Sequence, residues 1–395
     1  MSSGPELCPH APRCGPCPLR GVPYRQQLAR KRELVQAALD RAPALGGLVA
    51  EDIVGSRDLF GYRHIAKLAV RARRDGSLQA GVYAPGTHRL VDAERCAAQH
   101  PALSEVLSAV LEEASRLRIR AYDERTHEGE LRYLVARYGA WRRRVLLVLV
   151  TTSRETDRVR ELSRRVARRC RLLGGVVHNY NPERGNVILG RAFATLRPPA
   201  TLVERIGELE LQASPGAFLQ VNPWIARRIY ETALEWAAPA SDDHALDLYC
   251  GVGPLSLTLA TRAKFVVGIE DSPSALADAR ANQRRNRLYN ARFELADAAD
   301  ATARLRATLG AVDVVTLNPT RKGASTAVLE AVAGLRPRRI VYVSCEPRTL
   351  ARDLERLAVG GYRTLRVRPF DMLPQTEHVE TVSLLTRDDA IQRLG

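Results

Sequence analysis

The sequence predicts an α/β protein whose C-terminal part is a doubly wound parallel sheet. The chain has 395 residues, of which 45% are hydrophobic and 26% charged. This is enough apolar material to bury real cores, and it excludes a disordered chain. Residues 241–395 alternate short apolar runs with helical segments, which is the pattern of parallel strands joined by helices. A glycine-rich turn follows the first apolar run, at a place where such sheets bind ligands.

The strands expected in this C-terminal part are short and apolar. In chain order they are 245–249, 265–270, 293–295, 312–317 and 340–343, with a last one near 379–385. A helix is expected at 255–263, directly after the glycine-rich turn. Each expected strand ends near a polar residue or a cysteine, so the carboxyl edge of the sheet is the predicted location of the site.

Composition divides the chain into three expected segments. Residues 1–100 hold four of the seven cysteines together with helical and alternating patterns, and are predicted to form a small α+β region. Residues 101–240 are predicted to be a central α/β domain that handles the substrate, with helices at 103–117 and 157–170 and strands at 143–151 and 174–179. Residues 241–395 form the third segment.

The formal net charge of +16 predicts that polyanions are attracted to some face of the protein. Only four of the 60 basic residues are lysines, a bias that a GC-rich genome produces without selection for binding, so the charge alone leaves both interpretations open. The longest apolar stretch, 145–150, is far shorter than the roughly 20 residues of a membrane-spanning helix. The N-terminus shows no apolar signal region, so we expect a cytoplasmic protein without a membrane partner.

The turn at 247–253 has the features of a nucleotide site. The third glycine of the dinucleotide fingerprint is replaced by Ser256, which disfavours a pyrophosphate. Glu270 ends the next strand, where a carboxylate can accept hydrogen bonds from both ribose hydroxyls, and Asp297 follows the third strand, where it can meet an adenine amino group. This spacing is typical of S-adenosylmethionine sites; NAD binding and a non-binding loop are the alternatives.

A nucleophile and a base are expected at the same edge. Cys345 follows the fifth strand, and Glu380 approaches it if the last strand is antiparallel. Carbon 5 of uracil accepts a methyl group only after a thiolate adds to carbon 6, and a carboxylate then removes the carbon 5 proton. A buried structural thiol and a solvated strand residue are the alternative interpretations. We expect a basic neighbour to lower the pKa of the thiol, the candidates being Arg321, Lys322 and Arg348.

The segment after the fourth expected strand indicates which base is methylated. Asn318-Pro319-Thr320-Arg321 lacks the aromatic residue that stacks an aminopurine, which disfavours methylation of an amino group. RNA cytosine methyltransferases carry a second cysteine after this proline, where the present chain has Thr320. The sequence therefore favours uracil as the base that is methylated.

Taken together, the segments 247–253, 318–323, 344–345 and 370–380 resemble the RNA uracil-C5 (5-methyluridine) methyltransferases, most closely the bacterial 23S ribosomal RNA branch. The resemblance extends back through 179–190 and 218–223 and covers most of the chain. It implies a Rossmann-like class I methyltransferase sheet with an antiparallel last strand, Cys345 as nucleophile and Glu380 as base. It also implies cofactor-binding roles for Gln220, Tyr249, Glu270, Asp297 and Asn318. Thr320 and Pro254 depart from the family pattern without touching nucleophile or base.

The cysteines Cys8, Cys14 and Cys17, with Cys96 far downstream, offer enough thiolates for a tetrahedral metal or a cubane cluster. Their spacing does not choose between the two. The resemblance implies a [4Fe-4S] cluster, with a structural or RNA-positioning role because the methyl transfer needs no electron. Structural zinc is the alternative, with His10 or His100 replacing a thiolate. Cys170, in an arginine-rich helix, is expected to be incidental, and Cys250, in the cofactor loop, is expected to be a small packing residue.

The resemblance thus implies a ribosomal RNA processing enzyme that methylates a uridine of 23S RNA, without an obligate protein partner. Many bacterial members begin with an oligonucleotide-binding barrel, for which the residues before Cys8 leave no room, and this favours the shorter ribosomal members. A transfer-RNA uracil-C5 methyltransferase and a catalytically silent RNA-binding or ribosome-assembly protein are the alternatives. Arginine clusters are candidate phosphate contacts, at 142–144, 164–169, 227–228, 284–285 and 336–339.

Overall fold

The computed structural model describes residues 8, 10–155, 157–308 and 311–387. The chain forms two compact units. The first unit combines the described residues within 1–21, 58–205 and 213–216. The second unit combines the described residues within 22–57, 206–212 and 217–395.

The first unit is built on a mixed seven-stranded sheet with the strand order β3-β2-β1-β4-β5-β6-β7. Neighbouring strands are antiparallel except for β5 and β6, which run parallel. The strands are β1 (Ile65–Ala72), β2 (Leu78–Tyr83), β3 (Leu90–Asp92), β4 (Leu131–Gly139), β5 (Arg144–Thr151), β6 (Leu173–Tyr180) and β7 (Ala192–Arg197).

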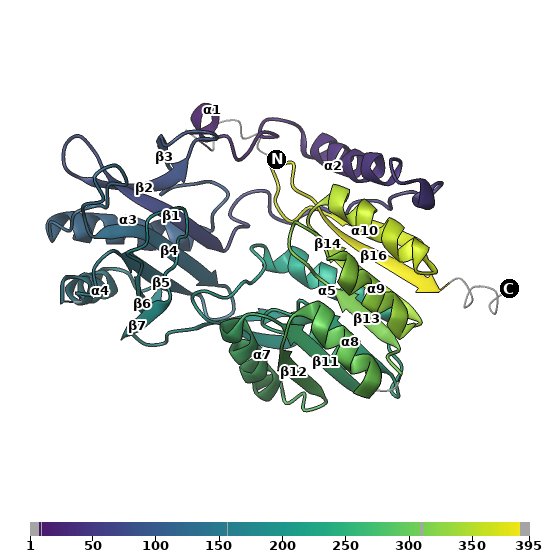
Figure 1. The fold of residues 1–395 in the computed structure, drawn as a ribbon. Coiled ribbons are helices and arrows are strands. Elements are labelled where there is room, and N and C mark those ends of the chain that lie inside the picture. The colour runs from purple at the N-terminus through teal and green to yellow at the C-terminus, as the bar shows by residue number, and fades with distance from the viewer. Residues whose placement is uncertain (1–7, 9, 156, 309–310, 388–395) are drawn as a thin grey trace. The chain divides into compact units, whose positions relative to one another are not determined.

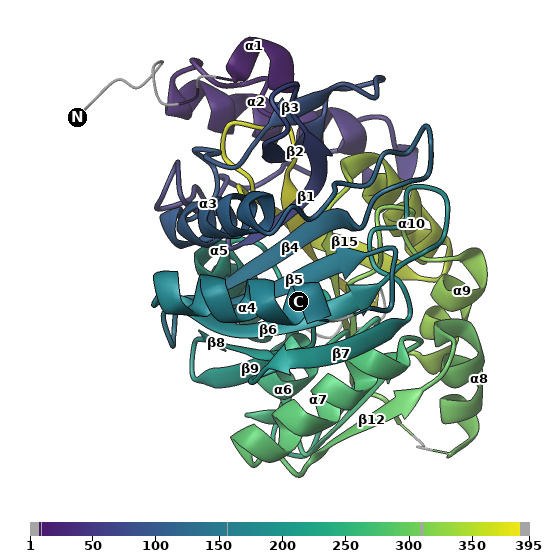
Figure 2. The same cartoon turned by 90° about the vertical axis from the view of Figure 1, so that its left-hand side faces the viewer.

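Helices α3 (Pro101–Arg116) and α4 (Asp157–Arg169) pack on one face of this sheet (Figure 2). In α4 the buried residues Val159, Leu162 and Val166 recur at helical spacing, so one stripe of an otherwise arginine-rich helix enters the core. A short helix, α1 (Ala11–Cys14), precedes them in the chain, and β8 (Leu202–Ile206) pairs with β9 (Leu209–Ala213) in a separate two-stranded sheet.

The second unit contains the doubly wound sheet, in the strand order β12-β11-β10-β13-β14-β16-β15. All neighbours among β10 to β14 are parallel, whereas β16 is antiparallel to both β14 and β15. The strands are β10 (His244–Leu248), β11 (Phe265–Glu270), β12 (Ala291–Leu295), β13 (Val314–Leu317), β14 (Arg339–Ser344), β15 (Tyr362–Phe370) and β16 (Glu380–Arg387).

Helices cover both faces of this sheet. One face carries a row of helices that Figure 1 shows side by side: α8 (Ala298–Thr308), α9 (Thr326–Leu335), α10 (Pro347–Val359) and α2 (Tyr24–Leu39). The other face is covered by α5 (Pro223–Ala237), α6 (Pro254–Ala260) and α7 (Pro273–Asn286). Because both faces are covered, the central strands are mainly apolar; β13 and the centre of β14 are fully buried.

The predicted fold class is confirmed, including the antiparallel last strand. The expected division into 1–100, 101–240 and 241–395 differs from the two units. The strands β1 to β3 pair into the same sheet as β4 to β7, so the first two segments share one core. Helix α2 instead buries Val35 and Leu39 against the sheet of the second unit.

None of the helices in the described ranges combines the length and the apolar character that a membrane span requires.

Candidate active site

Residues predicted for the site follow the carboxyl ends of the parallel strands of the second unit. Tyr249 comes directly after β10, Glu270 ends β11, and Asp297 lies shortly after β12. Asn318 and Cys345 directly follow β13 and β14. Since these strands run parallel and in register, the structure brings the five residues to one edge of the sheet.

The turn after β10 is held in a tight, left-handed conformation. Tyr249, Gly251 and Gly253 have φ angles of 62°, 56° and 88°. The Glu270 carboxylate accepts hydrogen bonds from the backbone N–H of Gly251 at 2.9 Å and of Ser272 at 3.0 Å. Burial raises the pKa of Glu270, and these two backbone donors act in the opposite direction. The carboxylate thus ties the glycine turn to the end of the neighbouring strand.

The residues at this edge fit an adenosine-bearing ligand. A Cβ placed on Gly251 would meet nothing within 4 Å, so there is open space beside the turn for a ligand to approach the backbone. Asp297 is exposed, and its Oδ1 accepts the N–H of Ala299 at 2.8 Å and of Asp300 at 3.3 Å. Glu270 and Asp297 therefore present carboxylates from adjacent strands, the chemistry that ribose hydroxyls and an adenine amino group require.

Gln220 comes from a different element. It is buried and lies just before Asn222, whose side chain caps α5 by accepting the N–H of Ile225 at 3.4 Å. The Asn222 amide also donates to Ser56 Oγ at 3.1 Å and to the carbonyl of Met372 at 3.4 Å. The cap therefore fixes the segment that carries Gln220.

Asp247, in β10, fixes the start of the turn through buried hydrogen bonds. Its carboxylate is fully buried and accepts hydrogen bonds from Ser256 Oγ at 2.5 Å and Thr316 Oγ1 at 2.6 Å. Burial raises the pKa of Asp247 to about 6, and the two hydroxyl donors act against that shift. Asp247 was not among the predicted site residues; its place as the acid that opens the glycine-rich motif was the only signal in the sequence.

The pairing of β14 with β16 brings the expected nucleophile and base together. Ser344 pairs with Thr381, and Thr381 Oγ1 donates to the carbonyl of Ser344 at 3.1 Å. One residue beyond this pair, Cys345 and Glu380 stand opposite each other at the end of the antiparallel ladder. Both side chains are partly buried. Two residues separated by more than thirty positions in sequence therefore share one end of the sheet.

The electrostatics of this pair differ from the expectation of a thiol that is largely ionised. The pKa of Cys345 is raised to about 11, mainly by burial and also by the charge of Glu380, while Arg321 acts to lower it. Burial also raises the pKa of Glu380 to about 7, again opposed by Arg321. Of Arg321, Lys322 and Arg348, Arg321 is thus the residue that lowers the pKa of the thiol, but the opposing effect of burial is larger.

His378 is a further residue at this site, to which sequence reasoning gave no role. The Arg321 guanidinium lies 3.0 Å from Nδ1 of His378, and the Arg321 carbonyl accepts a hydrogen bond from Thr349 Oγ1 at 3.1 Å. Burial, together with the charge of Arg321, lowers the pKa of His378. A neutral imidazole can accept from the guanidinium, so His378 orients the arginine that faces Cys345 and Glu380. Its spacing of two residues before Glu380 was the available signal.

The N-terminal cysteines lie close enough to influence one another. The pKa values of Cys14 and Cys17 are raised to about 11, mainly by burial and also by the neighbouring thiols of Cys96 and Cys8. All four side chains are partly buried. Within the part of the chain that the structure describes, however, no group of three or more His, Cys, Asp or Glu side chains is arranged to hold a metal ion. The donor set suits a soft metal or an iron–sulfur cluster, and the cluster stays a prediction.

His100, the histidine considered as a metal ligand, makes contacts within the fold. Its Nδ1 accepts the N–H of Ala102 at 3.2 Å and caps α3, and its ring stacks on Tyr138 with centroids 3.8 Å apart. Burial lowers the pKa of His100 to about 4. These contacts favour the four cysteines over a set in which His100 replaces one of them.

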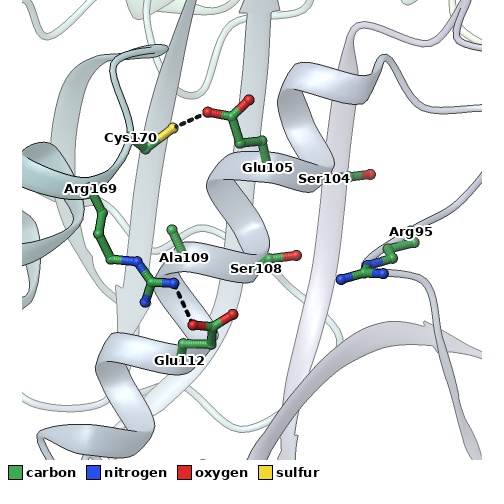
Figure 3. Close-up of a pocket in the computed structure, with 8 residues that line it drawn as sticks. All are labelled: Arg95, Ser104, Glu105, Ser108, Ala109, Glu112, Arg169 and Cys170. Atoms are coloured by element: carbon green, nitrogen blue, oxygen red, sulfur yellow. Dashed lines mark hydrogen bonds and ion pairs between the residues drawn. The ribbon is translucent and has the colours of Figure 1, made fainter.

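The two remaining cysteines, Cys170 and Cys250, are buried. Cys170 follows α4 and lines a cavity of about 340 Å³, where its thiol donates to Glu105 at 3.1 Å beside the ion pair of Arg169 with Glu112 (Figure 3). Burial and the Glu105 contact raise the pKa of Cys170. Cys250 is buried in the turn after β10, and burial raises its pKa as well. Neither thiol is activated.

Comparison with known proteins identifies the class of chemistry. Residues 205–388 match the family model described as tRNA (Uracil-5-)-methyltransferase. A protein of Halalkalibacterium halodurans named as an RNA methyltransferase is 38% identical over 96% of this chain and 82% of its own length. One of Geobacter sulfurreducens, also named as an RNA methyltransferase, is 39% identical over 96% of this chain and 77% of its own length.

A solved structure is similar over nearly the whole fold. It is the tRNA (uracil-54, C5)-methyltransferase of Pyrococcus abyssi in complex with S-adenosyl-L-homocysteine, with a TM-score of 0.80 and 26% sequence identity, covering 96% of this chain and 86% of that chain. With the methyltransferase sheet and the residues at its carboxyl edge, these similarities show that the chain belongs to the family of S-adenosylmethionine-dependent RNA (uracil-5-)-methyltransferases.

Proposed function

We propose that this protein methylates carbon 5 of a uridine in 23S ribosomal RNA through a covalent adduct between Cys345 and carbon 6. The observation that supports this proposal is the position of Cys345 opposite Glu380 at the carboxyl edge of the sheet. A soft nucleophile that can also leave and a carboxylate base are the two groups that the reaction requires.

The reaction runs in three steps. The Cys345 thiol loses its proton to solvent, and the sulfur forms a bond to carbon 6, which turns the ring into an enolate. Carbon 5 of this enolate takes the methyl group, which S-adenosylmethionine supplies when bound. Glu380 then removes the carbon 5 proton, and the electron pair of that C–H bond re-forms the double bond as the sulfur–carbon 6 bond breaks.

The shifted pKa values suit these roles. The Glu380 carboxyl, with a pKa raised by burial to about 7, is both a competent base and a group that can return its proton to solvent near neutral pH. Arg321 offers the positive charge that favours the thiolate when Cys345 ionises. Water exclusion by the bound RNA would strengthen this interaction, because charges attract more strongly in a dry site.

S-adenosylmethionine would be held at the same edge. In this proposal Glu270 binds the ribose hydroxyls and Asp297 the adenine amino group. Tyr249, Asn318 and Gln220 complete the set by the family pattern. The exposed carboxylate of Asp297 and the open space beside Gly251 support this assignment.

The RNA has two candidate classes. Ribosomal RNA is favoured by the sequence resemblance to the 23S branch, and the target would be a uridine in a loop or one flipped out of its stack. Transfer RNA is the second candidate, because the Pyrococcus abyssi protein of similar fold is a tRNA (uracil-54, C5)-methyltransferase. Either substrate would be consistent with the cytoplasmic location expected from the sequence.

We further propose that Cys8, Cys14, Cys17 and Cys96 hold a [4Fe-4S] cluster, with structural zinc as the alternative. The mutual effect of these thiols on the pKa values of Cys14 and Cys17 supports a shared site. Such a cluster would stabilise the fold or position the RNA, because no step of the methyl transfer exchanges an electron.

The deciding experiment uses RNA that contains 5-fluorouracil. Fluorine cannot leave carbon 5 as a cation, so an active enzyme stays covalently attached to the RNA after methyl transfer, and a denaturing gel detects the complex. We expect an adduct with the wild type and with Cys170→Ala, and none with Cys345→Ala. RNA binding by a wild type that forms no adduct would favour a catalytically silent RNA-binding protein. Transfer of labelled methyl groups to purified ribosomal or transfer RNA separates the two substrate classes.

A further inference from the structure

A buried polar network joins helix α2 to the loop between β15 and β16. This loop, residues 371–379, begins at Asp371, carries His378 and ends directly before Glu380. Lys31 Nζ lies 2.5 Å from Asp371 Oδ1 and donates to the carbonyl of Leu373 at 2.9 Å. The side chains of Lys31 and Asp371 are both completely inaccessible to solvent. The start of the loop is therefore fixed by a charge from a helix some 340 residues earlier in the chain.

Tyr24, at the first position of α2, completes the coordination of Asp371. Its hydroxyl donates to Asp371 Oδ2 at 2.8 Å and accepts the backbone N–H of Ser56 at 2.6 Å. Both oxygens of the buried carboxylate thus have a donor, as a buried charge requires.

Gln27 makes a second, reciprocal connection further along the loop. Its Nε2 donates to Gln375 Oε1 at 3.0 Å, and its Oε1 accepts the backbone N–H of Gln375 at 3.0 Å. Gln375 has a φ of 69°, in the left-handed region that residues with a Cβ rarely adopt. The pair of hydrogen bonds holds the loop in this strained turn three residues before His378.

Stability alone does not account for this network. A buried ion pair contributes little more to folding than apolar residues of the same volume, because desolvation cancels most of the attraction. Helix α2 is already anchored by the apolar residues Val35 and Leu39, which enter the core on the same face of the sheet. What the polar contacts add is a defined path for the loop that delivers His378 to Arg321 and Glu380 to Cys345.

We infer that Lys31, Tyr24 and Gln27 are positioning residues for proton abstraction, acting through the 371–379 loop on His378 and Glu380. This inference rests on the proposed function of Glu380. The three residues touch neither the uracil nor the methyl donor. Their effect lies in keeping the base within reach of the carbon 5 proton, where a displacement of about 1 Å can cost about 100-fold in rate.

The test compares Gln27→Ala and Lys31→Met with Val35→Ala in the full-length protein. Val35→Ala is the matched control, because it removes buried apolar contacts of the same helix and leaves every hydrogen bond between α2 and the loop in place. Hydrogen exchange of the 371–379 amides is measured together with kcat and KM for the RNA. We expect faster exchange and a kcat about 10- to 100-fold lower in the first two variants, with KM unchanged. The control should keep the loop exchange and kcat of the wild type.

The inference would be overturned if the 371–379 amides exchanged at the wild-type rate in both Gln27→Ala and Lys31→Met, or if Val35→Ala changed exchange and kcat by the same amounts. Faster exchange of the loop with a wild-type kcat would also overturn it. If Lys31→Met does not fold, Gln27→Ala and Tyr24→Phe still test the network. In both of these variants Lys31 still pairs with the buried carboxylate of Asp371. Absence of methyl transfer by the wild type would refute the proposed function, whereas the exchange measurement would still decide whether α2 orders the loop.

Discussion

Glu380 stands opposite Cys345 one residue beyond the Ser344–Thr381 pair that ends the antiparallel ladder of β14 and β16. The strand direction matters here. Had β16 run parallel to β14, its first residue would lie at the amino edge of the sheet, away from the thiol. The reversal of one strand is therefore what places a base beside a nucleophile that lies at the carboxyl edge.

Replacing Glu380 should stop the reaction at the covalent adduct with RNA that contains uracil. In Glu380→Gln the thiol can still add to carbon 6 and the methyl group can still arrive, but the carbon 5 proton has no acceptor. We expect turnover to fall by about 10²- to 10⁴-fold and a protein–RNA adduct to accumulate without 5-fluorouracil. A denaturing gel with uracil-containing RNA measures this. Free methylated RNA at the wild-type rate would show that another group takes the proton.

The rate should depend on pH through Glu380. Burial raises the pKa of this carboxyl to about 7, and only the deprotonated form acts as a base. Release of methylated RNA from the covalent adduct, the step in which Glu380 takes the proton, should therefore speed up with pH and level off above about pH 7. A profile already flat from pH 5 upward would contradict the assignment. The same shift makes the Glu380 contribution to stability largest below its unfolded pKa, and that contribution is lost as the pH rises through 7.

Asp247 should add a pH-dependent component to folding stability. Its pKa rises from 3.8 to about 6, so the folded state holds its proton more tightly, and this contribution is lost as the pH rises from about 4 to 6. The shift corresponds to about 3 kcal/mol. Urea unfolding of the wild type and of Asp247→Asn between pH 4 and 8 should show a difference in unfolding free energy that changes across this window. A constant difference would exclude a perturbed Asp247.

Arg321 should favour the thiolate of Cys345. Arg321→Met removes the positive charge that lowers the thiol pKa, so alkylation of Cys345 by iodoacetamide at pH 8 should slow by several-fold and the 5-fluorouracil adduct should form more slowly. Arg348→Met is the matched control, because Arg348 starts α10 nearby in sequence and is not among the causes of the Cys345 shift. Equal rates in Arg321→Met and the wild type would exclude this role.

Replacing one N-terminal cysteine should remove the proposed cluster without removing the catalytic reaction. Cys96→Ser should lower the iron and sulfide content of anaerobically purified protein, whereas Cys170→Ser should leave both unchanged. Because methyl transfer needs no electron, the variant should retain adduct formation with 5-fluorouracil RNA to the extent that it folds. Zinc in place of iron and sulfide in the wild type would favour the structural-metal alternative.

The local pattern of apolar residues in the sequence determined the positions of several strands and the edge of the sheet at which the site lies. The apolar runs predicted β10, β11 and β14 to within a residue or two, because strands covered on both faces are mainly apolar. The parallel direction of those strands then assigned Tyr249, Glu270 and Cys345 to one edge, since every carboxyl end of a parallel sheet meets there.

Only the tertiary structure decided the features that depend on distant residues. The partnership of Lys31 with Asp371 and the inclusion of α2 in the second unit could not be predicted, because a helix shows which face is apolar but not which sheet that face will cover. The thiol of Cys345 was expected to be ionised by neighbouring arginines, yet its pKa is raised, because the desolvation of a side chain depends on everything packed around it. Sequence therefore determined which groups are present at the sheet edge, and packing determined their charge and their partners.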